Sequence, residues 1–264
     1  MNFLKTKNKF LSSSCNSLMP DKDYFNDLII ADSLPKAWYF TLNINFREEK
    51  HSFEILKLKT KLAKFNNSDL RIQPQSDLHC SLLNILTIPY DPEVNQIEII
   101  NRILQNNKNE LEDFVQKFFS EKQKFYADFL YVSKESVALQ VFIDNKIVRD
   151  LKQLKKELEE SKCAENVRNE FPEVIWENKL KLNPKEQEGK SENYDDAWGA
   201  MNLIRYNVEK LTDLLAKDLS EEIKSFNRKS IEERNKTFFI KFNLKPVLVI
   251  SDHLFDEKSG SRIL

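Results

Sequence analysis

The 264-residue sequence predicts an α+β fold made of two similar lobes. Segments with the alternation typical of strands are interleaved with segments that carry helical stripes. A weak internal repeat consists of two strand–helix–strand units, namely 37–46, 52–65 and 78–86, then 136–142, 146–160 and 199–206. A duplicated unit of this kind is expected to pack as two lobes around a cleft, and clefts are where ligands bind.

Composition narrows the functional classes. Charged residues make up 31%, hydrophobic residues make up 41%, and the net charge is -1, as in ordinary globular domains. The sequence therefore has no general excess of basic residues of the kind that indicates nucleic-acid binding, although the net charge does not exclude a local basic groove. With only 3 glycines, glycine-rich phosphate loops and dinucleotide fingerprints are absent from the sequence.

Cysteines and apolar runs bear on compartment and partners. Cys15, Cys80 and Cys163 are odd in number and scattered, which argues against a disulfide framework or a zinc ligand set. We therefore expect the cytoplasm or another reducing compartment, with no bound metal and no cofactor. No apolar run is long enough to span a membrane, so a membrane partner is not expected.

Residues 1–35 predict a partly disordered N-terminal arm, and residues 36–264 predict one bilobal domain. Strand 37–46 follows from the alternation of Leu42, Ile44 and Phe46, and helix 52–65 follows from apolar residues spaced between lysines. The later elements are read in the same way: a helix that starts at 91–93 and runs to Phe118, strands 125–132 and 136–142, a helix 146–160, a charged excursion at 161–197, strand 199–206, a helix 211–223, and strands 237–244 and 246–251.

The run Leu78-His79-Cys80-Ser81-Leu82 is the candidate site. Side chains alternate along a strand, so His79 and Ser81 point to one face while Cys80 points to the other. An imidazole beside a hydroxyl suits proton transfer at a phosphate or an ester. The same spacing also fits a buried histidine with one satisfied hydrogen bond.

A second motif and the order of the elements extend this interpretation. The Leu78–Leu82 run matches the pattern LHxTL, and Ala200-Met201-Asn202-Leu203-Ile204-Arg205 occupies the place of a second strand of the form HxTLxR. A closing strand at 247–252 and Gly260 follow. In these features the chain resembles, over about residues 36–260, the two-histidine phosphoesterase superfamily, which includes 2′-5′ RNA ligase and cyclic phosphodiesterase proteins.

The resemblance implies a bilobal two-histidine phosphoesterase-like fold, with two antiparallel sheets and outer helices around a central groove. It implies that His79 and Ser81 are catalytic, and that two histidines would flank a phosphodiester and exchange protons with it. In this chain the second histidine position is held by Ala200, and the second threonine position is held by Asn202. The resemblance also implies substrate-binding positions, which are Asn202 and Arg205 for phosphate and Trp198 and Tyr206 for stacking on a base. An ordinary place in the core is the favoured interpretation for the two aromatic residues, and Arg205 equally suits a solvent-facing position.

Two hypotheses follow for a groove that binds a nucleotide or RNA phosphodiester. In the first, the protein is a phosphodiesterase that uses His79 with a non-standard partner, for which His253, Asp195 and Asp196 are the candidates. In the second, it is a catalytically silent relative that binds a nucleotide, RNA or a protein. A third interpretation is an α+β protein-interaction module whose resemblance to the superfamily is accidental.

Overall fold

The computed structural model describes residues 37–46, 49–65, 70–73, 78–91, 93–132, 136–182, 198–206, 213–233, 239–252 and 262–263. The expected N-terminal arm lies outside these residues, and the expected charged excursion is described only as far as residue 182. None of the described helices combines the length and the apolar composition needed to cross a membrane.

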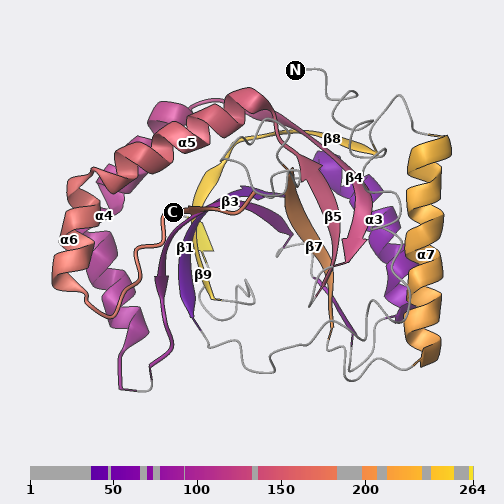
Figure 1. Cartoon of the computed structure of the whole chain (residues 1–264), viewed down its shortest axis with the longest axis horizontal. Helices are drawn as coiled ribbons and strands as arrows, with labels where there is room; N and C mark the ends of the chain where they lie inside the picture. The colour runs from indigo at the N-terminus through magenta and orange to yellow at the C-terminus, as the bar shows by residue number, and fades with distance from the viewer. Residues whose placement is uncertain are drawn as a thin grey trace, which may run out of the picture.

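The strands form one curled antiparallel sheet (Figure 1). Its main path runs in the order β10-β9-β1-β3-β7-β5-β4-β8, while β2 pairs with β7 and β6 pairs with β3. The bounds are β1 Trp38–Asn45, β2 Leu70–Ile72, β3 His79–Ile88, β4 Gln123–Val132, β5 Ser136–Phe142, β6 Lys179–Leu180, β7 Trp198–Tyr206, β8 Ile240–Leu244, β9 Val247–Asp252 and β10 Arg262–Ile263.

Helices cover the outside of the curl in two groups (Figure 1). Their bounds are α3 Glu49–Leu62 with the short 3-10 helix η1 Ala63–Phe65, α4 Gln96–Phe118, α5 Asn145–Glu159, α6 Lys162–Glu170 and α7 Asp213–Glu232. Helices α4, α5 and α6 contact one another. The other group, α3 and α7, is linked through η1, where Lys64 forms a 3.1 Å salt bridge with Glu222.

The internal repeat is visible in the pairing. In each unit the two strands are antiparallel neighbours, β1 with β3 and β5 with β7. The helix between them packs on the other half of the sheet, since α3 contacts β8 while α5 contacts β3 and β6. Each unit therefore packs its helix on the other half of the sheet, and this exchange of helices holds the two units together.

Two register shifts keep polar and apolar residues on separate faces of β1 and β3. The irregularities fall between Phe40 and Thr41 and between Leu42 and Asn43. At each shift one residue of β3 is left without a partner in β1. Polar residues of β1 therefore stay opposite polar residues of β3 along the strands. We call the resulting surface the polar face; its residues are Tyr39, Thr41, Asn43, Asn45, His79, Ser81, Asn84 and Thr87 in β1 and β3, with Ser136, Gln140, Ala200 and Asn202 in β5 and β7.

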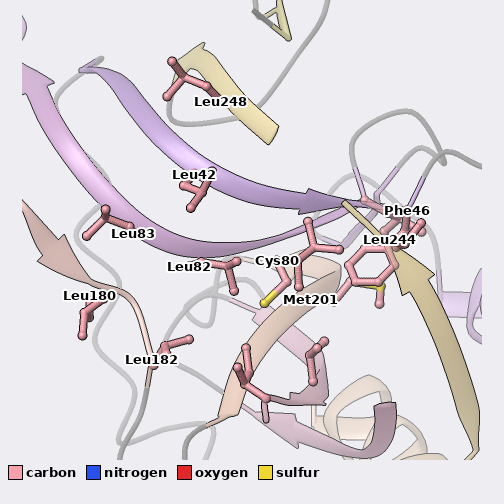
Figure 2. Close-up of a cluster of buried hydrophobic side chains, with 14 of the residues drawn as sticks. Leu42, Phe46, Cys80, Leu82, Leu83, Leu180, Leu182, Met201, Leu244 and Leu248 are labelled. Atoms are coloured by element: carbon pink, nitrogen blue, oxygen red, sulfur yellow. The ribbon is translucent and has the colours of Figure 1, made fainter. Parts of the chain in front are cut away.

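The opposite, apolar face forms the core together with the helices. Leu248, Leu42, Leu83 and Leu180 form one row across β9, β1, β3 and β6 (Figure 2). All of them are buried, as are Ile99, Ile100 and Ile103 of α4. Burial of each such side chain stabilises the fold by about 1.5–3 kcal/mol.

The expectation of two sheets is not confirmed, because both groups of strands belong to one sheet. The expected charged excursion begins with a helix that the sequence analysis missed, since α6 starts there with Ser161 as its N-cap. Cys163, Ala164 and Val167 bury one side of this short helix. Three small apolar residues in a charged segment give only a weak helical pattern, which explains the error.

The approach of β7 to β3 depends on Gly199. A Cβ atom at this position would lie 2.4 Å from the Sγ atom of Cys80. That is far inside van der Waals contact, and the thiol is fully buried, so it has no room to move. A side chain at residue 199 is therefore incompatible with a cysteine at residue 80.

We predict that Gly199→Ala destabilises the protein by about 1–3 kcal/mol, because the added methyl group overpacks the core. Replacing the thiol as well, in Gly199→Ala/Cys80→Ala, should recover most of this loss. Urea unfolding of the wild type, both single variants and the double variant provides the measurement. Equal losses from Gly199→Ala with and without the thiol would contradict the steric explanation.

Candidate functional site

The two motif strands meet at one residue pair. Cys80 of β3 pairs with Met201 of β7, and this is the only registered pair between the described parts of these strands. Beyond it β3 pairs with β6, and β7 pairs with β2. The two strands therefore diverge from this pair, which we call the junction, and the two halves of the sheet join there.

The junction brings the predicted motifs together on the polar face. Extending the antiparallel register by one residue on each side places His79 opposite Asn202 and Ser81 opposite Ala200. All four residues are half-buried, whereas Cys80 and Met201 are fully buried on the other face. These four residues flank the one registered pair and share a face, so their side chains are neighbours at the junction.

The arrangement of the two motif strands differs from the expected one. The resemblance implied two antiparallel sheets around a central groove, whereas β3 and β7 are neighbours in one sheet. His79 and Ser81 share a face, as the strand alternation predicts.

The Asn202 amide is oriented by a hydrogen bond. The Ser136 hydroxyl donates to Oδ1 of Asn202 at 2.9 Å. With its carbonyl oxygen engaged in this way, Asn202 presents its Nδ2 hydrogens as donors. A donor at this position suits an anionic oxygen, and Ser136, which the sequence analysis did not single out, holds it in place.

Three further predicted residues are described only through their backbones. Trp198 pairs with Phe142, while Arg205 pairs with Ser136 and Arg71, and Tyr206 pairs with Leu70. Their side chains lie outside the described part of the structure. The same holds for the whole of His253, Asp195 and Asp196, so the stacking, charge and replacement-base roles stay predictions.

Two buried amides border the four central residues, and the sequence analysis missed both. Asn43 pairs with Ser81 from the β1 side, and Gln140 pairs with Ala200 from the β5 side. Both side chains are 0% exposed, and neither amide has a hydrogen-bond partner among the described residues. A polar group buried in this state destabilises the protein by about 1–3 kcal/mol. The polar residues alternating with Leu42 and Ile44 were the available signal for Asn43, while Gln140 lies in an otherwise apolar strand.

Polar residues at the far end of β3 are better paired. Asn84 donates to the Thr87 hydroxyl at 3.0 Å, and Thr87 donates to Glu177 at 2.6 Å. Burial raises the pKa of the Glu177 carboxyl, but the hydrogen bonds from Thr87 and Asn84 and the charges of Lys181 and Lys179 outweigh it and bring that pKa below its usual value. Even here Oδ1 of Asn84 lacks a hydrogen-bond partner among the described residues, so Asn43 and Gln140 differ from it in that both polar atoms of each amide lack one.

No group of three or more His, Cys, Asp or Glu side chains in the described residues could hold a metal ion. A scan of the sequence against protein-family models and a search among curated proteins gave no match.

The junction thiol is not a nucleophile at neutral pH. Burial raises the pKa of Cys80 to about 12, and the backbone of Ala200 lowers it only in part. Burial, with a smaller contribution from the charge of Glu110, likewise raises the pKa of Cys163 to about 12. Because the thiolate is the reactive form, both cysteines are held in an inert state.

We predict that neither Cys80 nor Cys163 reacts with iodoacetamide at about pH 8 in the folded protein, and that both react rapidly in denaturant. Peptide mass spectrometry after timed labelling distinguishes the two sites. Fast native labelling of Cys80 with the sheet intact would contradict the assignment of its side chain to the buried face.

Proposed function

We propose that the protein is a two-histidine phosphoesterase-like protein that binds the phosphate of a nucleotide or RNA phosphodiester at His79, Ser81 and Asn202. We also propose that the two halves of its curled sheet correspond to the two lobes of that fold, with β3 and β7 as the central strands. The observation that carries the proposal is the register at the junction, which sets the His79 motif directly against its degenerate counterpart.

The donors on the polar face suit a phosphate. Ser81 supplies a hydroxyl, the oriented amide of Asn202 supplies N–H groups, and His79 adds positive charge when it is protonated. Hydrogen bonds to a charged group contribute about 1.5–3 kcal/mol each, so two or three of them give measurable affinity.

Catalysis by this site is impaired. Cleavage of a phosphodiester needs one group to accept a proton from the attacking oxygen and another to donate a proton to the leaving oxygen. His79 can perform one of these transfers, and Ala200 can perform neither. Each positioned acid or base contributes about 10²–10⁴ in rate, so the chain favours binding over turnover.

We predict that Ser81→Ala and Asn202→Ala each weaken binding of adenosine monophosphate or short RNA by about tenfold or more. Binding should also weaken as salt concentration rises, because phosphate contacts displace counterions. Isothermal titration calorimetry measures both effects. Asn243→Ala, at an exposed strand position on β8, is the matched control and should bind like the wild type.

Failure of every phosphate ligand to bind at low salt would overturn the proposal. Recovery of a specific protein partner in that case would favour the alternative, in which the chain is a silent relative that acts as a protein-interaction module.

We predict that Ala200→His/Asn202→Thr raises cleavage of a 2′,3′-cyclic nucleotide by about 10²-fold or more, because it restores a second proton-transfer group on the same face, diagonally across the two strands from His79. Chromatography of the products measures the rate. The same double substitution combined with His79→Ala is the control and should stay at the wild-type level. Robust wild-type turnover that survives His79→Ala would show that the chemistry lies elsewhere.

A further inference from the structure

A group of lysines lies at the end of the sheet that β4 and β8 form (Figure 1). Phe125 and Ala127 of β4 are buried in the core, as are Phe242 and Leu244 of β8. Strand alternation therefore turns the residues between them to the opposite side of the sheet, which is the side of the polar face. We call the lysines on this side the lysine cluster; they are Lys122, Lys124, Lys241 and Lys245.

The register brings the cluster together across the two strands. Lys241 is paired with Tyr126, and Lys124 is paired with Asn243. Extending this antiparallel register places the other two lysines of the cluster opposite each other. Residues two apart in a strand are separated by about 6.7 Å, so the cluster, with Tyr126 and Asn243, forms a strip about 13 Å long and two strands wide.

The strip has no acidic side chain of its own, since its other two members are neutral. The Nζ atom of Lys241 lies 5.7 Å from the centre of the Tyr126 ring. Lys245 donates from Nζ to Oε1 of Gln116 at 2.7 Å, which is again a neutral partner. Among the described residues, neither of these lysines nor Lys124 forms a salt bridge.

Acidic residues along β4 leave most of this charge unbalanced. Asp128 is buried, and its carboxylate accepts N–H bonds from Phe129 and Phe239. Glu121 is exposed at the other end of the strip, next to Lys122. Like charges directly opposite each other on neighbouring strands destabilise a sheet, so the strip lowers the stability of the free protein. An anion bound along the strip would remove that repulsion.

The shape of the strip favours one strand of a nucleic acid over a duplex. Lysines contact the phosphates of a nucleic-acid backbone without reading the base sequence. A duplex presents its phosphates in two rows on either side of a groove about 6 or 12 Å wide. The strip is narrower than this, because neighbouring strands lie only about 4.8 Å apart.

The surroundings of the strip also argue against a membrane surface. Segments that lie on a membrane combine basic residues with apolar side chains that enter the lipid. The exposed large apolar side chains of the described residues all belong to other parts of the chain; they are Leu56, Tyr90, Ile97 and Ile175.

We propose that the lysine cluster binds the backbone of a single nucleic-acid strand, with roughly one phosphate against each lysine. Binding here is independent of base sequence. The strip begins two strands from β7 and ends three strands from it, so it is a surface separate from the junction. It binds whether or not the junction holds a phosphate.

The test compares the wild type with a variant in which all four lysines of the cluster are replaced by glutamine. The probe is a short fluorescein-labelled oligouridylate, and its affinity is measured by fluorescence anisotropy over a range of salt concentrations. Each phosphate contact on a single strand contributes about −0.7 to the slope of log affinity against log salt concentration. The variant should therefore lose about tenfold or more in affinity at low salt, and its slope should be less steep by about 2–3. Each single Lys→Gln change should lessen the slope by about 0.7.

Two controls separate the strip from overall charge. Asn243→Ala removes a side chain in the middle of the strip without removing a charge. A second control replaces four exposed helix lysines by glutamine and so changes the net charge equally; they are Lys108, Lys156, Lys162 and Lys229. Both controls should keep the affinity and the salt slope of the wild type.

Three results would overturn the proposal. The first is an unchanged salt slope in the cluster variant, and the second is an equal loss in the variant of the helix lysines. The third is binding of phosphatidylserine vesicles through the cluster with no binding of oligouridylate. Adenosine monophosphate separates this surface from the junction: the cluster variant should bind it like the wild type, whereas Ser81→Ala should not. Either proposal can therefore fail while the other stands.

Discussion

The pairing of Cys80 with Met201 is the contact on which the arrangement of the polar face depends. It joins the two halves of the sheet through one residue from each, and it is possible because residue 199 has no side chain. Once this pair is set, strand alternation sends the thiol and Met201 into the core. The same alternation sends His79 and Asn202 to the opposite face. The positions of His79, Ser81, Ala200 and Asn202 on that face follow from this one register.

The register shifts of β1 against β3 are the second constraint. A strand that slips by one residue turns all its side chains to the other face. Here one residue of β3 is left unpaired at each of the two shifts, so Thr41 and Asn43 remain opposite Asn84 and Ser81. Without them, apolar residues of β3 would face the polar side chains of β1. The bulges therefore preserve a polar surface that curls with the sheet, while its reverse stays apolar enough to hold the helices.

Much of the fold could be predicted from patterns in neighbouring residues, whereas much of the site could not. The β5 strand at 136–142 and the shared face of His79 and Ser81 could be predicted, because alternation is written in neighbouring residues. The union of the strands in one sheet could not, since it rests on a pair of residues more than a hundred positions apart. Gln140 shows the same limit: within its strand it is one amide among apolar residues, and only the pairing with Ala200 places it beside the motif.

The composition of the polar face distinguishes between binding and catalysis as the role of the proposed site. A catalytic site needs groups whose interactions with the substrate strengthen in the transition state. The most important of these are an acid and a base on opposite sides of the bond that breaks. The central positions here hold one imidazole, a hydroxyl, an oriented amide and a methyl group. The flanking positions hold two neutral amides whose burial without partners lowers stability. Under the proposed function, a face of this composition would suit recognition of a phosphodiester better than its cleavage, because it offers hydrogen bonds and one imidazole but no second acid or base.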